Sequence, residues 1–129
     1  MKKFEIYHSD EAPKALGPYS QATQAGNFLF LSGQLPIDPS NNQVITGGIE
    51  EQTSRCLKNL FGVLKAAGLS SSHIVKTTVF LKNIEDFPKF NETYQKHFEP
   101  PYPARATVEI ARLYKDVLIE IDAIAVTTM

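Results

Sequence analysis

Three segments of this chain are apolar at both odd and even positions, and this feature most limits the folds that the chain can adopt. They are residues 27–33 (NFLFLSG), 76–83 (KTTVFLKN) and 117–126 (VLIEIDAIAV). Successive side chains of a strand point to opposite faces of a sheet, so a strand with one solvated face alternates apolar and polar residues. These segments therefore predict a sheet that is covered on both faces.

Two helices are expected from the spacing of the apolar residues. In residues 49–67 the apolar positions recur on one helical face, and Gly68 can end the helix. These positions are Ile49, Cys56, Leu57, Leu60, Phe61, Leu64 and Ala67. Asp86 can cap a second helix, and the prolines at 100 and 101 prevent it from continuing. Its expected core face consists of Phe87, Phe90, Tyr94 and Phe98.

The remaining segments are expected to form strands. Residues 4–9 resemble a short edge strand, and residues 20–35 a hairpin in which Gly26 and Asn27 supply the positive φ angles of a two-residue turn. Residues 73–83 are rich in β-branched side chains, and residues 102–126 are expected to form a last hairpin with its turn at 113–116. The order β-β-β-α-β-α-β-β predicts an α+β fold, a sheet with two helices on one face. The other face is then expected to be buried against other subunits.

Composition narrows the possible partners and compartments. The 129 residues are 43% hydrophobic and 21% charged, as expected for one globular domain over residues 1–129. A net charge of -1 gives no broad basic field, so nucleic acid is an unfavoured partner. No segment approaches the roughly 18 apolar residues of a membrane span, and no signal-peptide pattern is seen, so we expect a soluble cytoplasmic protein.

Charged residues within the last predicted hairpin raise a question about function. Alternation places Arg105, Thr107 and Glu109 on one side of their strand. Arg105 could pair with Glu120 or Asp122, or it could bind the carboxylate of a ligand with its planar fork of donors. With a turn at 113–116, Glu120 would lie about 13 Å along the strand from the position opposite Arg105. The sequence leaves both interpretations open.

Five blocks of the sequence closely resemble the RidA (YjgF) family. They are GPYSQA at 17–22, LSGQLPIDP at 31–39, GIEEQTSRCLKNLFGVLKAAG at 48–68, VKTTVFLKNIEDFPKFNETY at 75–94, and PARATVEIARLYKDVLIEIDAIAV at 103–126. The resemblance implies a chorismate-mutase-like subunit, a homotrimer with ligand clefts between subunits, and hydrolytic deamination of reactive enamines and imines. It also implies a functional link, without a required stable complex, to pyridoxal-phosphate dehydratases that act on threonine or serine and release such products.

The resemblance also assigns roles to individual residues. Arg105 matches the arginine that binds the substrate carboxylate, and Glu120 the acid associated with the attacking water. Further positions that match the family's cleft are Tyr19, Ser32, Gly33, Asn91, Ala106 and Thr107. Many members have cysteine where Thr107 stands, so thiol chemistry at this position is ruled out here. Tyr114 replaces a proline that is common in the following turn.

The implied chemistry needs neither a metal nor a cofactor. A 2-imino acid is already electrophilic at carbon 2, so its hydrolysis requires a carboxylate clamp, a held water and proton transfer. His8, His73 and His97 lack metal-ligand spacing, and the only cysteine, Cys56, is expected on the core face of its helix. Two alternatives remain open, a metabolite-sensing protein that binds 2-oxo acids without catalysis and, less favoured, an endoribonuclease.

Overall fold

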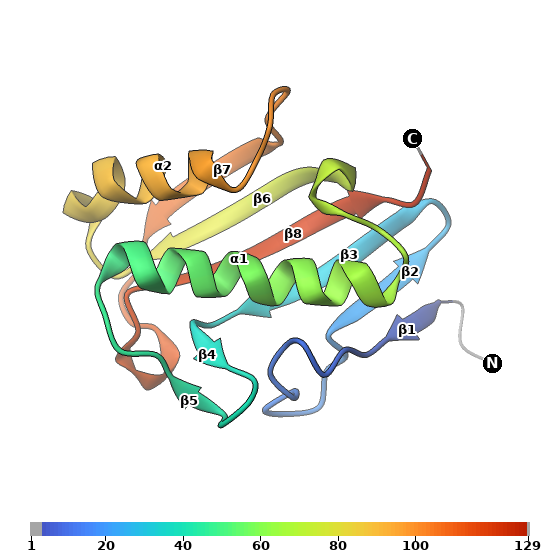
Figure 1. The fold of residues 1–129 in the computed structure, drawn as a ribbon, viewed down its shortest axis with the longest axis horizontal. Coiled ribbons are helices and arrows are strands. Elements are labelled where there is room, and N and C mark those ends of the chain that lie inside the picture. Colours follow the sequence, from blue (N-terminus) through green and yellow to red (C-terminus); the bar gives the residue numbers. More distant parts are fainter. Residues whose placement is uncertain (1–3, 129) are drawn as a thin grey trace.

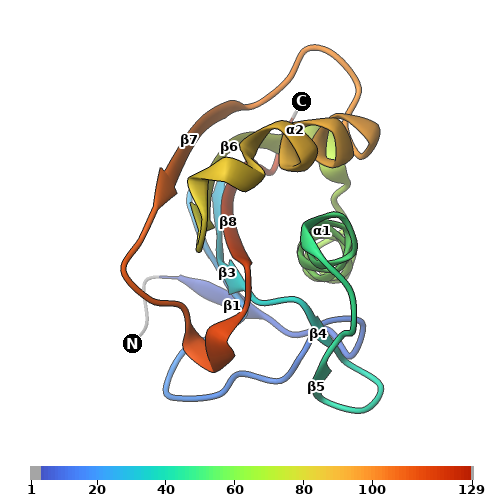
Figure 2. The same ribbon diagram turned by 90° about the vertical axis from the view of Figure 1, so that its left-hand side faces the viewer.

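The computed structural model describes residues 4–128, in which a twisted six-stranded sheet carries two helices on one face (Figures 1 and 2). The strand order is β1-β2-β3-β8-β6-β7. The strands are β1 (Glu5–Tyr7), β2 (Ala22–Ala25), β3 (Phe28–Gln34), β6 (Ile74–Leu81), β7 (Ala104–Glu109) and β8 (Ile119–Val126). The helices are α1 (Ile49–Ala66) and α2 (Phe87–Lys96). The α+β class and the placement of both helices on one face are confirmed.

Within residues 4–128, the fold also contains three short 3-10 turns and a small hairpin. The turns cover Ser71–His73, Ile84–Asp86 and Tyr114–Asp116. The hairpin joins β4 (Ile37–Asp38) to β5 (Gln43–Val44), follows β3 and precedes α1 along the chain, and is drawn below α1 in Figure 1. Its two-residue strands are too short to produce a periodic pattern, so no strand was expected there.

The predicted last hairpin is wrong. β7 pairs in parallel with β6, with Arg105 opposite Thr77, while β8 pairs antiparallel with both β3 and β6. The chain leaves β7 at the sheet edge and passes the end of β6 before it enters the sheet as β8. The expected opposition of Arg105 and Ile124 therefore does not occur. Two strands that are adjacent in sequence usually pair, but here β6 lies between them.

The first hairpin forms where it was expected, with a different turn geometry. Ala25 lies opposite Phe28, so Gly26 and Asn27 form a two-residue loop. Gly26 has a φ of 60°, whereas Asn27 does not adopt a positive φ. A positive φ at the first central residue alone is the pattern of a type II′ turn, in which only glycine is required.

Both predicted helices are present. α1 ends in a Schellman motif, because the Leu69 amide donates to the Leu64 carbonyl and the Gly68 amide to the Lys65 carbonyl, with Gly68 at a φ of 75°. Asp86 stands at the N-cap position of α2 but makes no side-chain capping hydrogen bond. A 3-10 turn over Ile84–Asp86 leads directly into α2, and Asp86 already has helical backbone angles. The expected cap is therefore not formed.

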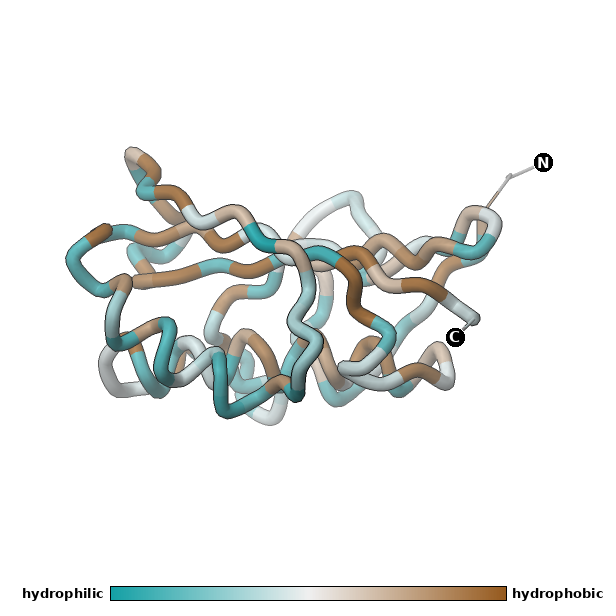
Figure 3. The backbone as a smooth tube through the Cα atoms, turned by 90° about the horizontal axis from the view of Figure 1, so that it is seen from above, coloured by the Kyte–Doolittle hydropathy of each residue, from teal (hydrophilic) through white to brown (hydrophobic). Residues whose placement is uncertain are grey.

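The core lies between the helices and one face of the sheet. The inward side chains of β8 are Ile119, Ile121, Ala123 and Ala125, all at most 2% exposed. α1 contributes Cys56, Leu57, Leu60, Val63 and Leu64, which are fully buried. Figure 3 shows the sheet as one layer and the helices as the other, with apolar residues running along the strands. The opposite face of the sheet carries exposed phenylalanines at 28 and 30 and is not covered by a helix.

No helix within residues 4–128 combines the length and the apolar character needed to cross a lipid bilayer.

Candidate functional site

The Arg105 side chain lies between β7 and α2, against a wall of aromatic rings. Its guanidinium carbon is 4.9 Å from the centre of the Tyr94 ring, 5.0 Å from Phe90 and 5.6 Å from Phe87. Arg105 Nη2 donates a hydrogen bond of 2.7 Å to Asn91 Oδ1. α2 presents these residues on one face because they follow helical spacing, three or four residues apart. Ring faces attract a cation, so the rings and Asn91 together hold the guanidinium group in place.

Arg105 has a charge with no carboxylate partner in the described residues. No aspartate or glutamate oxygen lies within 4.0 Å of its guanidinium nitrogens. A pocket of about 470 Å³ opens beside it and is lined by Asn91, Tyr94, Gln95, Tyr102, Pro103 and Arg105. Because a guanidinium group has five N–H donors and Asn91 accepts from one nitrogen, donors remain for a ligand. This pocket suits an anionic ligand of small size.

Glu120 lies on the opposite face of the sheet, against Gly33. Glu120 and Asp122 alternate in β8 with the buried Ile119, Ile121 and Ala123, so both acids point away from the helices. Gly33 lies in a bulge of β3, and a Cβ atom there would overlap Glu120 Oε2 and lie 2.9 Å from its Cδ. Burial, and then the nearby charge of Asp122, raise the pKa of Glu120. The glycine therefore makes room for a partly desolvated carboxyl group.

Ser32 and Tyr19 adjoin Gly33 on neighbouring segments. Ser32 Oγ donates to the Ser20 carbonyl at 2.6 Å, and the Ser32 amide donates to the Gln21 carbonyl at 2.9 Å. Tyr19 is 47% exposed, and its hydroxyl accepts a hydrogen bond of 3.0 Å from the Leu16 amide. The structure thus brings Gly33 and Glu120 together and holds the segment that carries Tyr19 to Ser32 through the Ser20 carbonyl.

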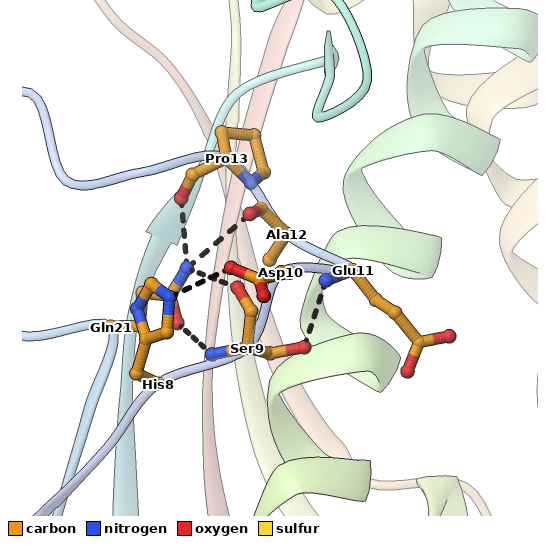
Figure 4. A network of polar contacts seen from close by, with 7 residues as sticks. All are labelled: His8, Ser9, Asp10, Glu11, Ala12, Pro13 and Gln21. Atoms are coloured by element: carbon orange, nitrogen blue, oxygen red, sulfur yellow. Dashed lines mark hydrogen bonds and ion pairs between the residues drawn. The ribbon is translucent and has the colours of Figure 1, made fainter.

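Gln21 anchors the segment that carries Tyr19, a role the sequence analysis missed (Figure 4). Gln21 is 3% exposed, and its Oε1 accepts from the Ser9 amide at 2.6 Å. Its Nε2 donates to the carbonyls of Ser9 at 3.1 Å and Pro13 at 2.9 Å. A buried carboxamide requires partners for its donors and its acceptor. Here the partners are backbone groups of residues 9–13, so Gln21 holds that segment to the start of β2. The anchoring role of Gln21 could have been suspected from its position directly before the apolar residues of a strand.

The predicted site residues therefore form two groups within one chain. Arg105, Asn91 and Thr107 lie on the helix side, whereas Glu120 and Gly33 lie on the opposite side. Ala106 alternates with Arg105 in β7 and is exposed, opposite Thr78 of β6. An ion pair between Arg105 and Glu120 or Asp122 is excluded within the chain, because β6 separates the strands and the side chains face opposite ways. The structural interpretation of Arg105 as half of such a pair is wrong.

The match to known proteins covers nearly the whole chain. A family profile described as Endoribonuclease L-PSP matches residues 9–127. The chain belongs to the RidA (YjgF) family.

Relatives of this RidA family member include proteins with and without a stated activity. A RutC family protein of Pyrococcus horikoshii is 51% identical over 121 residues, which are 94% of this chain and 96% of the relative. The human 2-iminobutanoate/2-iminopropanoate deaminase is 45% identical over 121 residues, 94% of this chain and 88% of the relative. The structure of TdcF from E. coli with bound serine has a TM-score of 0.92 and 39% identity, covering 96% of this chain and 99% of that one.

The helix side of this RidA family member contains further polar residues that sequence reasoning missed. Thr77 and Tyr94 share a buried hydrogen bond of 2.8 Å directly beneath Arg105. Gln95 and Tyr102 line the pocket, although neither was predicted. Thr107, which the sequence did single out, has a buried Oγ1 that makes no hydrogen bond to another described residue. Thr77, Tyr94 and Gln95 lie within amphipathic elements, where a polar or aromatic residue by itself does not distinguish a site residue from a core residue.

The histidines and the cysteine have structural environments. Within residues 4–128, no three His, Cys, Asp or Glu side chains are grouped so that they could hold a metal ion. His97 Nε2 is 3.0 Å from Ser54 Oγ, and His73 Nδ1 accepts from the Ser70 amide at 3.1 Å. His8 contacts Asp10 at the surface. Cys56 lies on the face of α1 that packs into the core, as predicted. Burial raises the pKa of its thiol, which therefore stays protonated.

Proposed function

We propose that this protein hydrolyses 2-imino acids and their enamine tautomers to 2-oxo acids and ammonia, in clefts between the subunits of a homotrimer. The observation that carries the proposal is the Arg105 guanidinium group, which has no carboxylate partner in residues 4–128 and is held against three aromatic rings at the mouth of a pocket. Such a fork binds a carboxylate through two parallel hydrogen bonds. The human relative that is named for this activity and the TdcF structure with bound serine support a ligand of amino-acid size.

In the proposed reaction, Arg105 binds the substrate carboxylate, and backbone donors near Gly33 and Thr107 fix the polar end of the ligand. Water adds its oxygen to carbon 2, and the imine nitrogen takes up protons until ammonia leaves and the C=O bond of the 2-oxo acid forms. Glu120 orients the water and accepts its proton, which a carboxyl group with a raised pKa can then pass on near neutral pH. The imine is already electrophilic, so this step needs no cofactor.

Two copies of the chain are required to bring these groups together. Arg105 and Glu120 face opposite sides of the sheet and cannot reach one ligand within a chain. The uncovered face also carries exposed apolar side chains, with Phe28 48%, Phe30 44% and Val108 43% exposed. Exposed apolar patches of this kind mark protein interfaces. In the proposed trimer, this face is buried and Glu120 of one subunit approaches Arg105 of its neighbour.

Sedimentation at micromolar concentration should therefore return three times the chain mass of 14.4 kDa. Burial of the apolar face favours assembly, so the trimer should persist on dilution to about 1 μM. Phe30→Glu, which would place a charge in the buried interface, should shift the protein to smaller species. A monodisperse wild-type monomer that is active would contradict the shared cleft.

Replacing Gly33 with alanine should reduce kcat without unfolding the protein. The added methyl group would displace the Glu120 carboxylate, and a misplacement of about 1 Å can lower turnover roughly 10- to 100-fold. Steady-state kinetics and thermal denaturation would separate the two effects. Gly48→Ala is the matched control. A Cβ atom at Gly48 would lie 3.8 Å from Glu51 Oε1, an ordinary van der Waals contact, and would not approach Glu120. Equal kinetics for both variants would argue against the role of Glu120.

The decisive experiment is ammonia release in a coupled reaction. Purified protein is added to a pyridoxal-phosphate dehydratase acting on threonine or serine, which generates the imine, and the first-order rate of ammonia formation is measured. Faster release that depends on protein concentration supports the proposal. Tight binding of 2-oxobutanoate without faster release would favour the metabolite-sensing alternative. Cleavage of a labelled RNA in a parallel incubation would support the activity for which the family profile is described.

A further inference from the structure

Beneath Arg105, a threonine from the sheet and a tyrosine from α2 form a buried hydrogen bond that the proposed reaction does not use. Thr77 Oγ1 and Tyr94 Oη are 2.8 Å apart. Thr77 is fully buried and Tyr94 is 4% exposed, so neither hydroxyl can exchange its partner for bulk water. In the described residues, this bond is the one side-chain hydrogen bond that directly joins β6 to α2.

The hydrogen bond fixes the ring on which the guanidinium group lies. Thr77 is the register partner of Arg105 across the parallel β6–β7 pair, and both side chains point toward α2. The Tyr94 ring lies 4.9 Å from the guanidinium carbon and is the nearest of the three rings. Phe90 and Phe98 pack against the same ring, with centroids at 5.4 and 4.6 Å, and restrict its movement.

Tyr94 keeps a neutral hydroxyl in this environment. Burial raises the pKa of Tyr94, while the hydrogen bond with Thr77 and the charge of Arg105 oppose that rise. A buried hydroxyl without a partner is unfavourable, so loss of Thr77 Oγ1 would drive the ring to tilt toward another hydrogen-bond partner. A tilted ring would carry Arg105 with it, because the guanidinium group rests on the ring face.

We propose that the Thr77–Tyr94 hydrogen bond is a positioning element that orients Arg105 for the ligand carboxylate. This inference rests on the proposed function, because that function makes Arg105 the residue that binds the carboxylate of the ligand. Asn91 fixes one edge of the guanidinium group and the Tyr94 ring fixes its plane, which leaves the remaining donors directed toward the pocket. Two fixed constraints define the direction of a planar fork, whereas either one alone permits rotation.

Three variants and one control test the proposal. Tyr94→Phe and Thr77→Val each remove one hydroxyl and keep the shape of the side chain. Each should weaken 2-oxobutanoate binding about 3- to 10-fold by calorimetry, and raise KM similarly with kcat within twofold. The double variant should be no worse than the worse single variant, because the two hydroxyls act as a unit. Thr53→Val is the control, since Thr53 is also fully buried and its hydroxyl makes no hydrogen bond within the described part of the chain.

A second readout does not depend on the proposed activity. In protein labelled with ¹⁵N-arginine, the Nε–H signal of Arg105 should be sharp and protected in the wild type and in Thr53→Val. It should broaden or exchange faster in Tyr94→Phe and Thr77→Val. If the signal is the same in all four proteins, or if ligand affinity is unchanged while the melting temperature falls, the positioning role is refuted. If the signal responds as expected but the wild type neither binds 2-oxo acids nor releases ammonia, the proposed function fails and the positioning of Arg105 stands.

Discussion

Replacing Arg105 with alanine should lower kcat/KM for imine hydrolysis by roughly 30-fold to several thousand-fold and abolish binding of 2-oxo acids. Loss of one partner of a desolvated charge pair costs about 2 to 5 kcal/mol, which corresponds to this range. Arg105→Lys should restore little activity, because a point charge cannot reproduce two parallel hydrogen bonds or stack on the Tyr94 ring. Steady-state kinetics and calorimetry with 2-oxobutanoate measure both effects.

The control for this experiment is Arg112→Ala, which removes an exposed arginine from the connection between β7 and β8. It should leave activity and ligand binding within about twofold of wild type, as for most surface substitutions. Both variants should remain folded trimers. If Arg105→Ala retained full activity but lost thermal stability, its contacts with Asn91 and the aromatic rings would be structural and the site assignment would fail.

Replacing Glu120 with glutamine should depress kcat by about 10²-fold or more while product-analogue binding stays within a few-fold of wild type. Glutamine keeps the shape of the side chain above Gly33 but cannot accept a proton from water. The expected pattern, a large change in kcat with a small change in affinity, is the reverse of that expected for Tyr94→Phe. Equal losses of kcat and affinity in Glu120→Gln would instead show that Glu120 binds the ligand.

The raised pKa of Glu120 also predicts a pH dependence. The base must be ionised, so kcat/KM should fall as pH drops through a pKa that lies above the usual range of a glutamate. Asp122→Asn removes the nearby negative charge and should move this acid limb to lower pH. Ionisation of Glu120 is less favourable in the folded chain than in the unfolded one, so it lowers stability as pH rises through the raised pKa. Glu120→Gln should therefore be at least as stable as wild type at neutral pH. A large loss of stability there would contradict the assigned environment.

Local patterns predicted most of the elements. α1 was predicted to within one residue of its observed C-terminus, because apolar periodicity and a glycine with positive φ are both local properties. The strands β3 and β6 and the turn at Gly26 were likewise evident. The failed cap at Asp86 has a local cause, since the preceding 3-10 turn had already placed its backbone in a helical conformation.

The site was only partly predictable. Arg105 and Asn91 were singled out, and the structure joins them by a hydrogen bond. Gly33 was also singled out, and the structure explains it by the Glu120 carboxylate that occupies the space of its missing side chain. Thr77, Tyr94 and Gln21 were missed, because a buried polar residue has the same local pattern whether it supports a site or merely satisfies the core.

The sequence by itself determined the helices, the apolar strands, the side of β7 that carries Arg105 and the family to which the chain is similar. These properties depend on neighbouring residues, whose spacing is set by helix and strand geometry. Only the tertiary structure decided that β8 enters between β3 and β6, that β7 runs parallel to β6, and that Arg105 and Glu120 face opposite sides of the sheet. Strand order depends on contacts between residues far apart in the chain, and for two-sided apolar strands several pairings bury similar surface, so the local pattern cannot distinguish them.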